Sequence, residues 1–140
     1  MRKRTKAREC ALKILYQTEI GGQSSEDSLK VFWQANETSD ASVREFATQL
    51  VVGVLEHVEP IDEVISKCAA NWQLKRMAVI DRNILRMATY ELLFLDDIPL
   101  KVSINEAVDL AKKFGDVESG RFVNGIIDKV KETSCQEKPN

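Results

Sequence analysis

The amino terminus is the stretch of the sequence with the most evident chemistry, because basic residues crowd into it. The first thirteen residues contain six bases and a single acid, Glu9, whereas the whole chain has a net charge of −2. A basic arm on a slightly acidic protein favours a local contact with phosphate over general binding of polyanions. A solvated arm without a ligand has the same composition, so both interpretations stay open. The bases are Arg2, Lys3, Arg4, Lys6, Arg8 and Lys13.

One aromatic residue follows this arm at a helical spacing. Tyr16 lies two turns after Arg8, and aromatic rings in RNA-binding proteins stack on unpaired bases. Packing in or beside the core is the alternative, and the sequence favours it because tyrosine has a large apolar body.

A second group of bases lies in and beside the most apolar stretch of the chain. Lys75, Arg82 and Arg86 are separated by seven and four residues, which predicts that they share one face near the start of a helix. Together with the arm they would form one basic strip if the two helices pack together. Arg82 and Arg86 can instead pair with acids such as Asp81 or Glu91, and for Arg86 both interpretations are equally supported.

No constellation of residues predicts catalysis, a metal site or a cofactor. His57 is the only histidine, which excludes a two-histidine metal site. We expect it at the boundary of the core near the end of the third helix. Cys10, Cys68 and Cys135 form no CxxC pair, so neither zinc nor a disulfide framework is indicated. The glycines match no phosphate-binding motif. A binding protein without catalytic residues is therefore expected rather than an enzyme.

Helices must position these side chains, because apolar residues recur at steps of three and four and no β-alternation of useful length appears. A central helix is predicted over residues 76–94, and it is apolar nearly all round, so other helices must bury it. Before it, we expect the first helix to end at Gly21–Gly22, the second to be capped by Ser24 or Ser25, and a loop over 36–40 with cap candidates Thr38 and Ser39. The third helix is expected to run through Val58, and Pro60 lies in the first turn of a fourth helix whose apolar stripe reaches Trp72. After it, we expect a capping box at Ser103–Glu106 to open the sixth helix, Gly115 to end that helix, and the seventh to start at Glu118 or Ser119.

About seven helices with short joints predict one compact all-α domain. No apolar run is long enough to span a membrane, and no signal peptide is evident. The cysteine pattern fits a reducing compartment, so we expect a cytoplasmic protein. The tail over 133–140 is polar, and we expect it to be frayed.

Three blocks of the sequence carry a resemblance to a known family. They are RECALKILYQ near the start, IDRNILRMATYELL in the centre and IPLKVSINEAVDLAKKFGDVESGRFVNGIIDKV near the end. In order and spacing they resemble the NusB family of transcription antitermination factors, over nearly the whole chain. The last block is the most specific of the three, and the segment over 21–72 is the least diagnostic. The resemblance implies one NusB-like domain over 1–140, built from two small helical bundles at about 5–58 and 60–132.

The same resemblance implies a function in transcription. Family members bind boxA RNA of ribosomal RNA leader transcripts together with NusE, a small-subunit ribosomal protein, and join the RNA polymerase elongation complex with other Nus factors. The family's arginine-rich RNA element maps onto Arg4, Lys6 and Arg8, preceded by two further bases. Thr5 interrupts it and Lys6 replaces an arginine, which would weaken two-point phosphate contacts.

The surface for NusE is expected around the loop over 95–101 and the start of the sixth helix. Its acids could meet a basic ribosomal protein, although the same residues also suit a solvated turn. The residues proposed for this surface are Asp96, Asp97, Lys101, Asn105 and Glu106.

Two other functions remain as alternatives. A helical adaptor would use its surface for proteins and bind no RNA. NusB-like domains also precede the catalytic domain of ribosomal RNA cytosine methyltransferases. Such enzymes need a cofactor-binding α/β domain after the helices, and we do not expect methyl transfer from the sequence 1–140. Some family members are dimers, and the sequence leaves a homodimer open.

Overall fold

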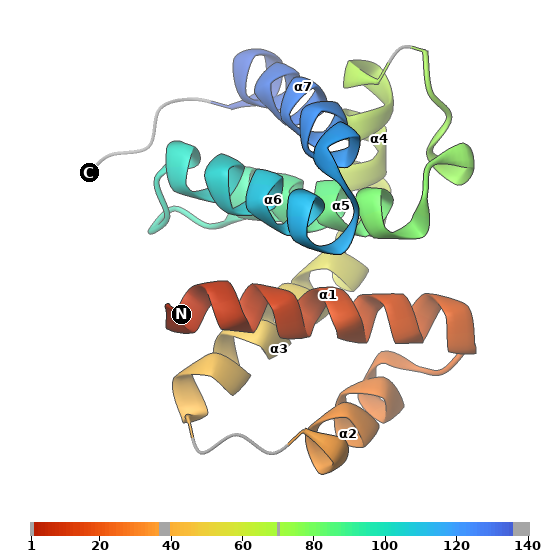
Figure 1. The fold of residues 1–140 in the computed structure, drawn as a ribbon, viewed down its shortest axis with the longest axis vertical. Coiled ribbons are helices and arrows are strands. Elements are labelled where there is room, and N and C mark those ends of the chain that lie inside the picture. Colours follow the sequence, from red (N-terminus) through yellow and green to blue (C-terminus); the bar gives the residue numbers. More distant parts are fainter. Residues whose placement is uncertain (1, 37–39, 70, 136–140) are drawn as a thin grey trace. The chain divides into compact units, whose positions relative to one another are not determined.

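The computed structural model describes residues 2–36, 40–69 and 71–135. Within these ranges the chain forms seven α-helices and one 3-10 turn and no strand, which confirms the prediction of an all-α fold (Figure 1). The cap candidates Thr38 and Ser39 and the end of the predicted frayed tail lie outside the described residues. The elements are α1 (Lys3–Gly21), α2 (Ser25–Ala35), α3 (Ala41–Glu56), α4 (Val58–Cys68), η1 (Leu74–Arg76), α5 (Val79–Phe94), α6 (Leu100–Phe114) and α7 (Val117–Ser134).

The chain divides into two compact units, Met1–Glu56 and His57–Asn140. The first unit is built on the packing of α1 against α3, with α2 joined to both (Figure 1). Its core is lined by apolar side chains of α1 and α3 and is closed by Phe32 and Trp33 of α2, whose rings meet edge to face at 4.9 Å. The buried residues of α1 and α3 include Ala7, Ala11, Ile14, Leu15, Phe46, Leu50 and Val51.

Two of the predicted boundaries in this unit are confirmed by their local chemistry. The backbone of Gly22 is left-handed, with φ of 66°, and its N–H donates to the carbonyl of Thr18, which ends α1. Glycine adopts this conformation without steric cost. The hydroxyl of Ser24 accepts a hydrogen bond from the N–H of Asp27 at 3.1 Å and caps α2.

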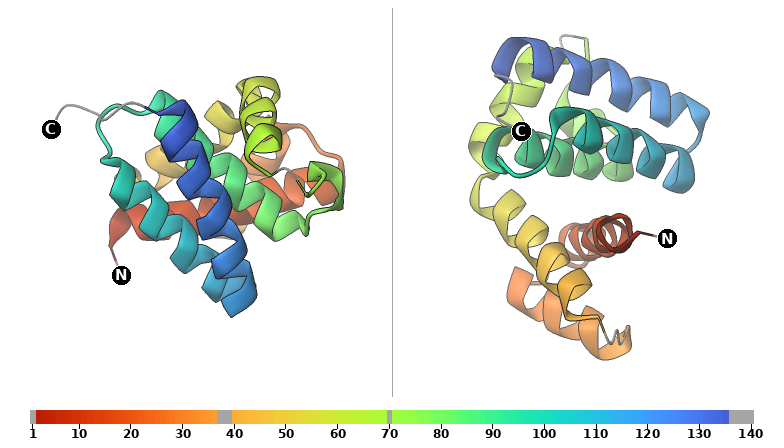
Figure 2. Two further views of the ribbon diagram at one scale, coloured as in Figure 1. Left: turned by 90° about the horizontal axis from the view of Figure 1, so that it is seen from above. Right: turned by 90° about the vertical axis from the view of Figure 1, so that its left-hand side faces the viewer.

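The second unit surrounds α5 with the other helices. α6 and α7 make the most extensive helix pair there, and α5 packs against α4, α6 and α7 (Figure 2). The buried residues of α5 include Ile84, Leu85, Met87, Ala88 and Leu92. None of the described helices combines the length and apolarity needed to cross a bilayer.

Several predicted boundaries of the second unit are wrong. Val58 belongs to α4, and Trp72 lies beyond the end of that helix. By contrast, the expected position of His57 is confirmed, because it directly follows the last residue of α3 and is half-buried. The centroid of its ring lies 4.3 Å from that of Phe94. The central helix begins at Val79 rather than Arg76, because residues 74–76 form a separate 3-10 turn.

Two predicted helix starts also differ. α6 begins at Leu100, directly after Pro99, so the predicted capping box at Ser103–Glu106 is wrong. The hydroxyl of Ser103 is buried and donates to Glu91 at 2.8 Å, and a hydroxyl used in this way cannot cap the helix. α7 begins at Val117, because the carboxylate of Asp116 accepts from the N–H of Ser119 at 2.8 Å. An acid at this position satisfies an N–H group at the positive end of the helix.

Candidate nucleic-acid interface

Exposed bases mark the first turns of α1. Arg2 precedes the helix, and Lys3, Arg4 and Lys6 lie in its first two turns with exposed side chains. The first turn contains no acid. Positive side chains at the positive end of a helix dipole oppose helix stability by a few tenths of a kcal/mol each. Helix stability therefore does not explain this placement of the bases.

Phe46 of α3 orients two arginines of the arm. The guanidinium carbon of Arg4 lies 4.4 Å from the centroid of its ring, and that of Arg8 lies 5.3 Å away. Both are within the range of a cation–π interaction. The two residues differ in exposure, because Arg4 is open to solvent whereas Arg8 is only 2% exposed. Arg8 is therefore placed to support the arm from inside, although the sequence predicted it as an RNA contact.

Lys3 is tied to the start of α3. Its Nζ lies 3.2 Å from Oδ2 of Asp40. Oδ1 of Asp40 accepts from the hydroxyl of Ser42 at 2.6 Å and from its N–H at 3.0 Å. The hydrogen bond from the Ser42 hydroxyl, followed by that from Lys3, lowers the pKa of Asp40 to about 2. Asp40 therefore competes, while ionised, with any phosphate that approaches Lys3.

Tyr16 is 40% exposed, so its ring lies beside the core and not within it. The buried stripe of α1 runs through Ile14 and Leu15, and the tyrosine ring lies outside it. Lys13 lies one turn before Tyr16 and is also exposed.

The predicted basic face of the central helix does not form. Lys75 is exposed, but it lies in the 3-10 turn rather than on α5. Arg82 is half-buried, and its Nη1 donates to the carbonyls of Leu74 at 3.1 Å and Met77 at 3.4 Å. Its guanidinium thereby fixes the turn that precedes α5. The break between Met77 and Val79 is the reason that the seven-residue spacing from Lys75 to Arg82 does not place them on one helical face.

Arg86 makes a two-point ion pair with Asp62 of α4. Its Nε lies 2.8 Å from Oδ1, and its Nη2 donates to Oδ2 at 2.9 Å. The sequence offered Asp81 or Glu91 as its partner, and the structure corrects this to an acid on another helix. The spacing of residues along one helix can identify only partners on that same helix.

The residues predicted for a protein partner lie at the junction of α5 and α6. Asp96 and Asp97 are exposed in the loop, and Lys101 and Asn105 are exposed on α6. Glu106 is half-buried. No group of histidine, cysteine, aspartate or glutamate side chains in the described part of the chain could hold a metal ion.

Comparison with known proteins agrees with this architecture. The NusB family profile matches residues 5–132. Transcription antitermination protein NusB of Anaeromyxobacter dehalogenans is 48% identical over 128 residues, which cover 91% of this chain and 89% of that protein. The structure of T. maritima NusB has a TM-score of 0.87 at 40% identity and covers 95% of this chain and 93% of that one.

A third relative is a chain from the crystal structure of antitermination factors NusB and NusE in complex with double-stranded RNA. It has a TM-score of 0.86 at 30% identity, over 94% of this chain and 98% of that one. The match of the family profile to nearly the whole sequence establishes that this chain belongs to the NusB family of transcription antitermination proteins.

Proposed function

We propose that the protein binds boxA RNA of ribosomal RNA leader transcripts together with NusE and carries it to the elongating RNA polymerase with other Nus factors. It acts in the cytoplasm and as a binding protein, without a catalytic step. The observation that carries this proposal is the similarity, over 94% of the chain, to a structure of NusB and NusE in complex with RNA.

The exposed bases at the start of α1 supply the phosphate contacts in this proposal. Phosphate contacts dominate the affinity of most protein–nucleic acid complexes. Arg8, Arg82 and Arg86 have a different role, because their side chains are buried or half-buried and are held by protein groups. They position the surface rather than touch RNA. The residues proposed as direct RNA contacts are Arg2, Lys3, Arg4, Lys6, Tyr16 and Lys75.

The loop between α5 and α6 is proposed as the surface for NusE. Its exposed Asp96 and Asp97 offer negative charge to a basic ribosomal protein. Lys101, Asn105 and Glu106 continue this surface along the first turns of α6.

The salt dependence of RNA binding tests the proposal. Labelled boxA RNA is titrated with the protein, with and without NusE, at several salt concentrations. Each phosphate contact to a single strand contributes about 0.7 to the slope of log affinity against log salt. Replacing Arg2, Lys3 and Lys6 by glutamine should therefore weaken binding and reduce the slope by about 2.

A charge-matched control separates a local contact from the effect of net charge. Lys67, Lys129 and Lys131 are also exposed and lie in the second unit. Their replacement by glutamine removes the same charge and should leave the slope unchanged. Equal affinity in the arm variant and the wild type would exclude the arm as the contact. A protein that binds NusE but no boxA RNA would instead be an adaptor.

A further inference from the structure

Trp72 is the most exposed aromatic side chain in the described part of the molecule, and its position is fixed. It lies between α4 and the 3-10 turn and is 55% exposed. Its ring meets that of Phe122 on α7 edge to face, with centroids 5.5 Å apart and an interplanar angle of 79°. One such contact orients the indole and leaves most of it uncovered.

The backbone around Trp72 is also held in place. The N–H of Trp72 donates to the carbonyl of Ala69 at 2.9 Å, and that of Arg76 donates to the carbonyl of Gln73 at 2.9 Å. The guanidinium of Arg82 holds the carbonyl of Leu74. These hydrogen bonds reduce the conformational freedom that residues 72–76 would lose on binding a ligand.

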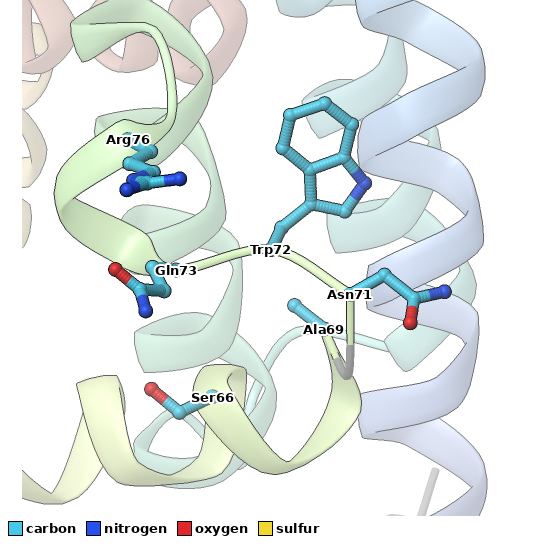
Figure 3. Close-up of a pocket in the computed structure, with 6 residues that line it drawn as sticks. All are labelled: Ser66, Ala69, Asn71, Trp72, Gln73 and Arg76. Atoms are coloured by element: carbon cyan, nitrogen blue, oxygen red, sulfur yellow. The ribbon is translucent and has the colours of Figure 1, made fainter.

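A hollow of about 500 Å³ adjoins the indole (Figure 3). It is lined by Ser66, Ala69, Asn71, Trp72, Gln73 and Arg76, and Arg76 is the one charged residue among them. The amide of Asn71 points toward α7, away from Gln73 and Arg76. Figure 3 shows the indole standing between α7 and the turn that carries Arg76. Amide and hydroxyl groups both donate and accept, which suits the edges of unpaired nucleobases. The volume is within the range of small-ligand sites.

A smaller hollow of about 280 Å³ is also lined by Trp72 and Arg76, but acidic residues predominate in it. It is lined by the carboxylates of Asp81, Asp116 and Glu118. Burial raises the pKa of Asp81, and the negative charge of Asp116 adds to that rise. The three acids disfavour a phosphate backbone there, so the larger hollow, whose one charged residue is Arg76, suits a nucleic acid strand better.

We propose that one unpaired RNA base stacks on Trp72 in the larger hollow, with its edge read by Gln73 and its phosphate held by Arg76. This inference rests on the proposed function and adds a contact in the second unit to those of the basic arm. Stacking tolerates any base, because every base has a π-face, whereas the amide of Gln73 gives the site a preference.

Variants of Trp72 and Arg76 separate stacking from charge. In anisotropy titrations with labelled boxA RNA, Trp72→Leu should weaken binding about ten- to a hundredfold with an unchanged salt slope. Trp72→Phe should restore most of the affinity, because phenylalanine still stacks. Arg76→Gln should weaken binding and also lower the slope by about 0.7. Phe94→Leu is the matched control at another exposed aromatic residue, and it should bind RNA like the wild type.

Photo-crosslinking to the same RNA locates the contact independently of affinity. Trypsin releases Trp72 in a peptide that ends at Lys75, and this peptide should carry the crosslinked nucleotide. Thermal unfolding of each variant verifies that it folds. Wild-type affinity in Trp72→Leu, or the lack of a crosslink in this peptide, would overturn the inference while leaving RNA binding established.

Two other outcomes would also overturn the inference. If the wild type binds no boxA RNA, the proposed function fails together with the site. If NusE binding, measured without RNA, is weakened by Trp72→Leu while RNA affinity is not, the hollow is a protein-docking site.

Discussion

Arg86 of α5 and Asp62 of α4 are joined at two points, from Nε to Oδ1 at 2.8 Å and from Nη2 to Oδ2 at 2.9 Å. Both side chains are largely withdrawn from solvent. Parallel contacts between a guanidinium and a carboxylate are stronger and more directional than single ones. This ion pair fixes α4 against α5. Because Arg86 is engaged in it, Arg86 is not available for the RNA contact that the sequence suggested.

Removal of Asp62 should therefore destabilise the protein. Asp62→Ala leaves the partly buried guanidinium of Arg86 without its acid, and we expect the free energy of unfolding to fall by about 1–3 kcal/mol. Glu63 supplies the control, because its pair with Lys67 is exposed and contributes less than about 0.5 kcal/mol. Urea unfolding measures both. If the two alanine variants unfold alike, the pair is not structural.

The buried contact between Ser103 and Glu91 gives a second prediction. The Ser103 hydroxyl donates to Oε1 of Glu91 at 2.8 Å, and both residues are almost fully buried. Ser103→Ala removes a donor from a buried carboxyl group and should cost about 1–3 kcal/mol of stability. Val102→Ala, at the exposed neighbouring position, should change stability by less than about 0.5 kcal/mol. A Ser103→Ala midpoint equal to that of Val102→Ala would contradict the assignment.

Two glycines of α7 should respond differently to the same substitution. A Cβ on Gly125 would meet no atom within 4 Å, so Gly125→Ala should stabilise the protein by about 0.5–1 kcal/mol through helix propensity alone. A Cβ on Gly120 would lie 2.8 Å from Cγ of Lys112, where α6 and α7 pack closely. Gly120→Ala should gain less or destabilise. Thermal melts of the two variants test the difference, and a larger gain for Gly120→Ala would refute it.

Asp40 should restrain the basic arm. Asp40→Asn keeps an acceptor for Ser42 but releases Lys3 and removes a negative charge next to the arm. We expect it to raise the affinity for boxA RNA, measured at moderate salt. Glu45→Gln removes an exposed acid elsewhere on α3, and a smaller effect is expected there. An equal gain in both variants would mean that only net charge matters.

The protonation of Asp40 sets the pH range over which its contacts with Lys3 and Ser42 persist. Its pKa is lowered from 3.8 to about 2. A lowered pKa in the folded state stabilises that state above the unfolded pKa, and the contribution is lost as the pH falls through the folded value. The contact should therefore persist unchanged above pH 3.8 and disappear toward pH 2. NMR titration of the Asp40 carboxyl measures the midpoint, and a value near 3.8 would contradict the hydrogen bonds from Ser42 and Lys3 that lower its pKa.

Apolar periodicity was sufficient to predict the helices but not all of their ends. The stops at Gly22 and Gly115 and the cap at Ser24 depend on neighbouring residues, so the sequence reveals them. Ser103 resembled a cap in sequence, but its hydroxyl bonds to Glu91 on another helix, a partner twelve residues away. Local signals cannot distinguish these two uses of a serine.

The sequence identified which basic residues belong to the candidate site, but it did not show which of them are exposed. Six bases in thirteen residues identified the arm. The burial of Arg8 depends on tertiary packing, and one of its contacts is Phe46, 38 positions later in the chain. Asp62, the partner of Arg86, lies 24 residues away on another helix. Trp72 continued the apolar spacing of α4, and only the end of that helix at Cys68 reveals it as a surface residue.

Each of the two units contains one tryptophan, so the fluorescence of each indole reports on one unit. Trp33 is buried in the first unit, whereas Trp72 is exposed in the second. A buried indole emits at shorter wavelength than a hydrated one, so the two emission bands can be followed independently during denaturation. Coincident curves would mean that the whole chain melts in one step, and separated curves would assign a stability to each half.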